Sequence, residues 1–451
     1  MVAVSSRAMM GVLLLLPAIA AAAGEGEGEG EQQQSQERRS YMPTFSLPAG
    51  GARAGEGGAT RQEPTSAGVS AERLGVTMDF PEWLRGVLGK EKPKPEAEAE
   101  QEPGRRQLTW APYITTSPLV GVGFGVGAAG TRQRGDPATT RISKFSASFL
   151  VTTQRQYQAP LRTDIVLPGG DWNLVGLWVW SKFPSPTWGL GGNTPDSAKT
   201  TIDYQLLRFY ETVNRRVAKN FYLGVGYRLD YYFNVKDQAA GTGRVTEFTT
   251  YPWGTGSTSF NSSLVANVLY DTRDSPVYAT RGFYANLSYA FTPHAVLGSD
   301  TTWQSVYLDL RHYFLFGRRL VLGLWSYAWF DFGEVPYLEL PSIGSDPDAR
   351  SGRGYIEGRH RGKALLYGEA ELRFTIWQWL GAVLAFNAHS VSQPEANGIL
   401  NDEPRFQYWW PSVVVGARIL ALKATHSNVC IDFAFGKNGQ NGVYFNFAEA
   451  F

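Results

Sequence analysis

The chain of 451 residues has a single cysteine, five histidines and almost balanced charges. One cysteine, Cys430, excludes an internal disulfide framework and a cysteine-rich metal site. The histidines show no spacing typical of metal ligands, so we expect neither a metal nor another cofactor. A formal net charge of +1 gives no electrostatic reason to expect nucleic acid as a partner. The function must therefore be sought in the fold rather than in a metal, redox or nucleic-acid site.

Long apolar runs are also missing beyond the amino terminus. From residue 107 onward no uninterrupted apolar stretch is long enough for a spanning helix, which excludes a helical membrane domain. The one apolar run, residues 9–20, follows Arg7, and Ala18 with Ala20 or Ala21 with Ala23 provide the small residues of a cleavage site. This order is typical of a secretory signal peptide, which we place at residues 1–23. The alternative is a membrane anchor or core helix, but the run is short and contains Pro17.

Residues 24–106 have few apolar side chains and are rich in Gly, Pro, Glu and Gln. Such a segment buries too little surface to offset the entropy of ordering, so we predict a disordered periplasmic segment. One stretch differs, because residues 70–90 predict a short amphipathic helix, either transient or a docking peptide. Its apolar residues are Leu74, Val76, Phe80, Trp83, Leu84, Val87 and Leu88.

Residues 107–451 show apolar side chains with a period of two. In residues 221–231 an apolar set (Phe221, Leu223, Val225, Tyr227, Leu229, Tyr231) alternates with a set that carries glycine and charge (Tyr222, Gly224, Gly226, Arg228, Asp230). A soluble β-sandwich is the alternative. The segments, however, have the length of tilted membrane strands, and aromatics crowd their ends, as in "FQYWWP" at 406–411. We therefore predict an all-β fold, a transmembrane antiparallel β-barrel.

The number of such segments predicts about 16 strands, since bacterial barrels of one chain usually have an even number. Closure into a ring leaves no unpaired edge in lipid. The predicted strands are 107–117, 118–130, 141–153, 157–167, 172–182, 201–213, 220–233, 259–271, 281–291, 302–314, 319–332, 364–375, 381–391, 412–420, 427–436 and 442–451.

The carboxyl end resembles the signal by which barrel proteins are recognised for outer-membrane assembly. The residues that carry this resemblance are Gln440, Gly442, Phe445, Phe447 and Phe451. Glu449 stands where an aromatic residue is usual. An ordinary closing strand is the alternative, which accounts equally for Phe445 and Phe447 but not for the aromatic terminus.

The longest connection between predicted strands, residues 333–363, contains "SGRGYIEGRHRG". Its triplet Arg353, Gly354 and Tyr355 resembles the signature of the sixth extracellular loop in the outer-membrane assembly-factor superfamily, also called the bacterial surface-antigen family. That superfamily includes the barrels of the Bam and Tam insertases and of two-partner secretion transporters. A second pattern at 269–291 also matches, through Asp271, Arg273, Asp274, Pro276 and Gly282.

The resemblance implies an extracellular loop that folds into the barrel and latches there. Alternation in residues 364–375 turns Glu369 and Glu371 inward, so either can pair with Arg353. Asp432 also faces inward, whereas Asn387 stands where the family usually has an aspartate. We expect Asn387 to accept a hydrogen bond from Arg353 without neutralising it. The alternative is an ordinary solvated surface loop.

The resemblance further implies insertion or translocation of protein or lipid at the outer membrane of a Gram-negative bacterium. Partners would be outer-membrane lipid, the machinery that assembles the barrel itself, and a polypeptide or lipid client. The periplasmic repeats usual in the family are not evident in residues 24–106, which favours the alternative, a passive plugged pore or structural barrel. No Gly-x-Ser-x-Gly motif occurs, and we expect no enzyme activity.

Overall fold

The computed structural model describes most of the predicted barrel and a short part of the preceding segment. The described residues are 74, 78, 80–87, 106–117, 121–136, 139–395, 400–423, 426–446 and 449–451. The predicted signal peptide and nearly all of the predicted disordered segment lie outside them. Within the described residues, none of the helices has the length and apolar character needed to cross a membrane.

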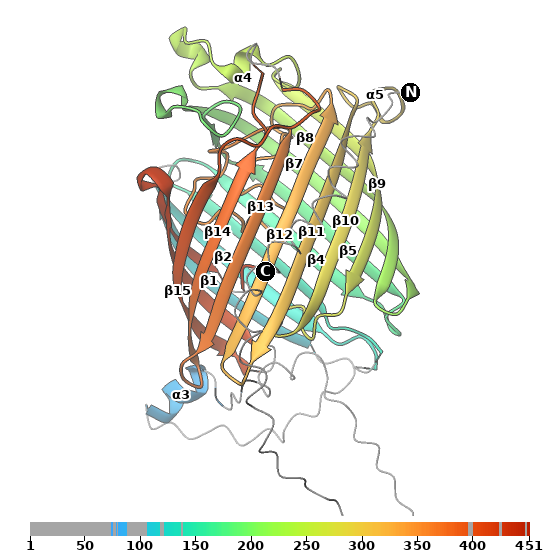
Figure 1. The fold of residues 1–451 in the computed structure, drawn as a ribbon, viewed down its shortest axis with the longest axis vertical. Coiled ribbons are helices and arrows are strands. Elements are labelled where there is room, and N and C mark those ends of the chain that lie inside the picture. The colour runs from blue at the N-terminus through green and yellow to red at the C-terminus, as the bar shows by residue number, and fades with distance from the viewer. Residues whose placement is uncertain are drawn as a thin grey trace, which may run out of the picture. The chain divides into compact units, whose positions relative to one another are not determined.

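The described residues form one antiparallel sheet of 17 strand segments, each paired with a neighbour in chain order (Figure 1). The first nine are β1 (Arg106–Ser117), β2 (Gly121–Arg132), β3 (Ser143–Thr152), β4 (Tyr157–Val166), β5 (Trp172–Lys182), β6 (Ser185–Thr187), β7 (Thr200–Ala218), β8 (Phe221–Asp237) and β9 (Thr258–Asp271). The others are β10 (Gly282–Thr292), β11 (Trp303–Phe316), β12 (Leu320–Gly333), β13 (Ala364–Thr375), β14 (Leu380–Val391), β15 (Trp410–Leu422), β16 (Ser427–Gly436) and β17 (Asn441–Asn446).

Segments β5 and β6 are two parts of one interrupted strand. Both pair with β7, β5 through Lys182 opposite Gln205 and β6 through Ser185 opposite Ile202. The 17 segments therefore correspond to the 16 strands predicted, and the predicted antiparallel barrel is confirmed.

The strands alternate between a lipid face and an interior face, as the period of two requires. On β8, Leu223 and Val225 are 47% and 71% exposed, whereas Tyr222 and Asp230 on the other face are buried. An outward apolar face suits lipid, and an inward polar face can hold charges only if they find partners. The interior is therefore where ion pairs and hydrogen bonds determine the structure.

Two strands end five residues away from their predicted ends. β7 extends five residues beyond the predicted end at 213, because it pairs with β8 down to Ala218 opposite Phe221. The last predicted strand, 442–451, is wrong at its end, since β17 stops at Asn446. Residues 449–451, here called the C-terminal tail, are buried instead. The side-chain contacts that hold the tail are described with the site below.

The two ends of the barrel differ in their connections. Most turns at one end are short, such as 219–220 and 317–319, whereas the other end carries the loops 188–199, 238–257, 334–363 and 392–409. Long loops are typical of the extracellular end. Of these loops, 188–199 contains the 3₁₀ turn η1 (Asp196–Ala198), and 238–257 contains the turn η2 (Ala240–Thr242) and the short helix α4 (Glu247–Thr250). The helix α5 (His294–Leu297) lies between β10 and β11, and the turn η4 (Lys437–Gly439) lies between β16 and β17.

Among the described residues before the barrel, α3 (Phe80–Val87) is a helix within the predicted stretch 70–90. The rings of Phe80 and Trp83 pack on Trp379, in the turn between β13 and β14, with centroid distances of 5.1 and 4.7 Å. Leu74 is buried beside Tyr278, Val321 and Leu420. The predicted helix therefore exists and contacts the turn-rich end of the barrel.

Candidate functional site

The long loop, residues 334–363, leaves β12 and passes through the interior before it joins β13. Its tip lies against β15 and β16, where Gly354 has φ +104°. A Cβ atom at Gly354 would lie 2.9 Å from Cβ of Ser412 and 3.2 Å from the backbone nitrogen of Gly436. Both the left-handed backbone and the lack of space require glycine here. The tip of the long loop therefore packs closely against β15 and β16 at Gly354.

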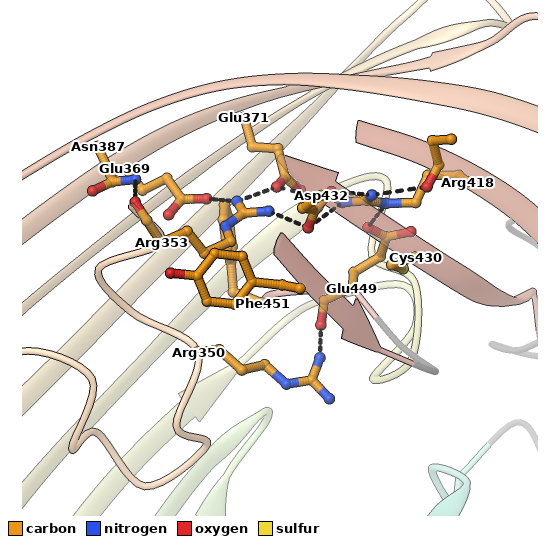
Figure 2. A network of polar contacts seen from close by, with 12 residues as sticks. Arg350, Arg353, Glu369, Glu371, Asn387, Arg418, Cys430, Asp432, Glu449 and Phe451 are labelled. Carbon is orange, nitrogen blue, oxygen red and sulfur yellow. Dashed lines mark hydrogen bonds and ion pairs between the residues drawn. The ribbon is translucent and has the colours of Figure 1, made fainter. Parts of the chain in front are cut away.

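Arg353 at this tip is 3% exposed and contacts three carboxylates (Figure 2). Its Nη1 donates to Oδ2 of Asp432 at 2.7 Å, and its Nη2 donates to Oε2 of Glu371 at 2.6 Å. Nη2 also contacts Glu369. The planar guanidinium with its fork of donors suits such a cluster, which a single ammonium could not span.

Two strands supply these carboxylates from opposite sides of the tip. Glu369 and Glu371 are two residues apart on β13, so both face the interior, and Asp432 faces it from β16. The hydroxyl of Tyr367, also inward on β13, donates to Glu369. The structure therefore brings together the residues that the sequence proposed as latch and latch partners.

A second layer of arginines continues the network. Arg418 on β15 contacts Oδ1 of Asp432 at 2.5 Å and Oε2 of Glu449 at 2.7 Å. Arg373 on β13 contacts Oε1 of Glu371 at 2.7 Å. Three arginines and four carboxylates thus form one buried network, in which every carboxylate contacts a guanidinium. Removing one member would leave an uncompensated buried charge.

The C-terminal tail is part of this network. Besides its contact with Arg418, Glu449 accepts a hydrogen bond from Nδ2 of Asn428 at 2.7 Å. Nη2 of Arg373 donates to the backbone oxygen of Phe451 at 2.9 Å, and Arg350 of the long loop donates to the backbone oxygen of Glu449. These contacts explain why β17 is short: the inward charges hold the tail away from the sheet.

Phe451 fills the interior rather than facing lipid. It is 7% exposed, and its ring lies 5.3 Å from that of Trp325 and 6.0 Å from that of Tyr313. Among the other residues of the predicted assembly signal, Gln440 lies in the turn before β17, and Gly442 and Phe445 lie on β17. Phe445 is 70% exposed, and Phe447 lies outside the described residues. The signal itself stays a prediction.

Tyr355 and Asn387 form further hydrogen bonds at the tip of the long loop. The Tyr355 hydroxyl donates to the backbone oxygen of Pro411 at 2.5 Å and accepts from the backbone N–H of Lys437 at 2.9 Å. The expectation that Asn387 accepts a hydrogen bond from the Arg353 guanidinium is wrong. Its Nδ2 instead donates to the backbone oxygen of Arg353 at 3.3 Å. Three carboxylates already occupy the guanidinium, so the amide binds the carbonyl beside it.

A histidine pair joins the long loop to β14. Nδ1 of His360 lies 2.7 Å from Nε2 of His389, and the ring of His360 stacks on Trp410. Burial, aided by the neighbouring His389 and Arg359, lowers the pKa of His360. The loop imidazole is therefore uncharged at neutral pH, and the pair is a neutral hydrogen bond.

The second sequence pattern lies in the turn between β9 and β10, apart from the tip of the long loop. Asp271 is bound by Arg273, with Nη2 to Oδ2 at 2.9 Å, and Asp274 accepts from the backbone N–H of Thr280 at 2.9 Å. The backbone oxygen of Pro276 accepts from Nζ of Lys144 at 3.2 Å. Gly282 has φ +102° and no room for a side chain beside Thr272. This pattern stabilises a turn.

Sequence reasoning missed Arg350, Arg418 and the inward role of Glu449. Arg418 had a detectable signal, because alternation on β15 places it on the same face as Ser412 and Val414. Glu449 had none, since nothing in the pattern of residues 442–451 shows that the strand stops at Asn446.

Comparison with known proteins agrees with this architecture. The family model described as the Omp85 superfamily domain matches residues 182–388, which include the long loop and the turn between β9 and β10. None of the curated proteins matches the chain.

Three solved structures are similar in shape. BamA from Haemophilus ducreyi lacking POTRA domains 1–3 is 16% identical, with a TM-score of 0.47, covering 76% of this chain and 69% of that one. CdiB from Escherichia coli is 11% identical, with a TM-score of 0.48, covering 75% and 61%. CdiB from Acinetobacter baumannii is 11% identical, with a TM-score of 0.45, covering 76% and 60%.

The chain thus spans about three-fifths of the length of the two CdiB chains. All three TM-scores lie below 0.5. The family model matches the sequence over the long loop and β13, which carry Arg353, Glu369, Glu371 and Arg373. Arg418, Asp432 and Glu449 lie outside the matched residues. Residues 182–388 of this chain therefore match the Omp85 superfamily domain.

Proposed function

We propose that this chain acts in the insertion or translocation of protein or lipid at the outer membrane of a Gram-negative bacterium. The observation that supports this role is that side-chain contacts, and not strand pairing, hold the two segments that close the interior. The long loop and the C-terminal tail meet at Arg353, Glu371, Arg373 and Glu449, outside the strand ladders. Both segments can leave their places without breaking a strand pair, so a passage can open while the barrel stays folded.

The ion pairs and hydrogen bonds that hold the two segments can be replaced by other polar contacts. A polar network inside the barrel can be replaced by water or by polar groups of a client, whereas a packed apolar core cannot. The partners in this proposal are outer-membrane lipid around the barrel, a polypeptide or lipid client, and the assembly machinery that inserts the chain itself. The proposed role is not enzymatic and involves no nucleic acid.

A passive plugged pore is the second candidate. The observation that favours it is the number of buried contacts on one side chain, because Arg353 pairs with three carboxylates. Opening must break all three pairs, and an uncompensated buried charge costs about 3–5 kcal/mol. A barrel with this latch and no client would restrict diffusion.

Reconstitution in liposomes tests the latch. Arg353→Ala is compared with wild type and with Arg244→Ala, whose side chain binds only backbone oxygens of an exposed loop. We expect conductance to rise at least tenfold in Arg353→Ala and to stay unchanged in Arg244→Ala. Equal conductance in all three proteins would remove the latch.

The same liposomes separate the two functions. An unfolded outer-membrane barrel is added as client, and its assembly is followed by resistance to protease. Faster assembly than in empty liposomes supports insertion. Conductance that responds to Arg353→Ala, without faster assembly of the client and without transfer of fluorescent lipid, supports the passive pore and contradicts the preferred proposal.

A further inference from the structure

A polar cup opens at the extracellular end of the barrel, and the proposed function does not use it. Its volume is about 400 Å³, within the range of about 300–1,000 Å³ typical of small-molecule sites. Four separate parts of the chain line it: the loop after β6, the long loop, the start of β15 and the turn before β17. The lining residues are Asn193, Thr194, Pro195, Asp196, Arg359, His360, Trp410, Asn438 and Gln440.

The floor of the cup is rigid and buried. His360 and Trp410 are stacked with a centroid distance of 4.4 Å, and both are buried. Arg359, also buried, is held by the backbone oxygen of Thr194 at 2.9 Å and its hydroxyl at 2.8 Å. These contacts fix the floor before any ligand arrives, which reduces the entropy cost of binding.

Unused hydrogen-bonding groups surround this floor. In the part of the chain that the structure describes, Nε2 of His360 and Nε1 of Trp410 are buried without a partner. On the rim, the side chains of Asn193 and Asn438 are exposed and that of Gln440 is half-buried, so their amides are accessible from the cup. A buried polar atom without a partner costs free energy, so a ligand or water that satisfies it is favoured.

The charge of the cup indicates the class of ligand. Its two charged residues, Arg359 and Asp196, pair with each other at 3.3 Å, so the cup has no net charge. Each rim amide offers both a donor and an acceptor, which matches a hydroxyl group better than a phosphate or a carboxylate. Rings at the floor provide an apolar surface. A neutral ligand with many hydroxyls satisfies all three features.

The cup also lies beside the lipid face. Tyr408 and Trp409, just before β15, are 38% and 50% exposed, as expected of aromatics at a membrane interface. A Cβ atom at Gly192 would lie 3.3 Å from Nε1 of Trp410 and 3.4 Å from Cβ of Tyr408, so cup and interface share this corner. Sugar from the outer leaflet and sugar from solution both have access.

We propose that the extracellular cup between Asn193, His360, Trp410 and Asn438 is a binding site for a neutral saccharide. The sugar is either part of a glycolipid headgroup in the outer leaflet or a soluble glycan. The rim amides bind its hydroxyls, above the buried floor of His360 and Trp410.

The test uses the full chain in phospholipid nanodiscs and isothermal titration calorimetry. The probes are a delipidated oligosaccharide of the uncharged outer chain of lipopolysaccharide, maltotriose, and an uncharged Gly-Asn peptide. The test variant is Asn193→Ala with Asn438→Gly. Asn438 has φ +60°, so glycine removes the amide without straining the backbone. Asn220→Gly is the matched control, because Asn220 also has φ +60° and lies in a turn at the other end.

We expect saturable binding of a sugar that is weakened at least tenfold in the double variant and unchanged in Asn220→Gly. Binding of the delipidated oligosaccharide alone supports a glycolipid source, and binding of maltotriose supports a soluble glycan. Absence of sugar binding to wild type overturns the proposal, as does equal affinity in the double variant. Binding of the peptide alone also overturns it, in favour of a polypeptide site. Heat-modifiable gel mobility shows that each variant is folded.

Discussion

At the scale of single residues, some positions at the tip of the long loop tolerate only one kind of residue. Gly354 is such a residue, because its φ of +104° and its contact with Ser412 leave no place for a side chain. Arg353 is another, since three carboxylates converge on one guanidinium. The tip of the long loop therefore has little freedom to shift along the wall.

Gly354→Ala should release the tip. A left-handed alanine costs about 1–2 kcal/mol, and the Cβ atom would clash with Ser412 as well. We expect higher conductance in liposomes, as for Arg353→Ala. Gly298→Ala is the control, because Gly298 has φ +72° but nothing within 4 Å of the added atom. If neither variant raises the conductance, the close packing of Gly354 against Ser412 does not hold the long loop in place.

Glu449→Gln should free the C-terminal tail. Burial alone would raise the pKa of Glu449, but Arg418 and Arg373 outweigh it, and the net pKa is lowered below the ordinary 4.5. A lowered pKa stabilises the folded state above pH 4.5, and this contribution is lost as pH falls through the folded value. The wild-type tail should therefore loosen only below about pH 4.5, whereas the variant tail is already loose at pH 7.

Release of Phe451 by a carboxypeptidase measures this prediction. At pH 7 we expect digestion of Glu449→Gln at least tenfold faster than of wild type. Glu334→Gln, in the exposed start of the long loop, serves as the control and should match wild type. A wild-type tail that is digested as fast as the variant at pH 7 would show that the ion pairs do not hold it.

At the scale of elements, the strands could be predicted from local alternation, whereas the latch partners of Arg353 were expected only with the help of the family resemblance. Strand positions follow from the alternation of lipid-facing and inward residues, which is local and visible in the sequence. The contact of Arg353 with Asp432 joins residues 79 apart, and no local pattern encodes it. β17 was predicted too long because apolar and polar residues alternate through residues 442–451 as they do in a strand. The arginines that bind the tail inside the barrel lie on β13 and β15.

Helix α3 depends on one aromatic side chain for its place. Trp379→Ala removes both ring contacts, each worth about 0.5–1.5 kcal/mol beyond area burial. We expect trypsin to cut after Arg85 roughly tenfold faster, because 1.4 kcal/mol changes an equilibrium tenfold. Trp377→Ala is the matched control, since Trp377 lies in the same turn and is 64% exposed. Equal cleavage of both variants would mean that α3 is held elsewhere.

At the scale of the whole molecule, the outer face of the barrel contacts lipid, and the network of Arg353, Arg373, Arg418 and four carboxylates joins the segments inside it. The loop and the tail have separate sequences but share Glu371, which contacts both Arg353 and Arg373. Shared partners make the two segments energetically dependent on each other. Loss of either should weaken the other.

A double-mutant cycle checks this dependence. Arg353→Ala, Glu449→Gln and their combination are unfolded with urea in detergent, and the free energy of unfolding is measured. We expect the double variant to lose less than the sum of the single losses, with a coupling of about 0.5–3 kcal/mol. Arg244→Ala combined with Glu449→Gln should be additive. Additivity in both pairs would mean that the loop and the tail are independent.

The position of the last contacts along the chain constrains how the protein matures. Asp432 and Glu449 come after β15 in the chain, whereas Glu369 and Glu371 lie on β13. If strands are added in chain order, we expect the long loop to bind β13 before it binds Asp432 and the tail. An unfinished barrel should then conduct ions more readily than the complete one.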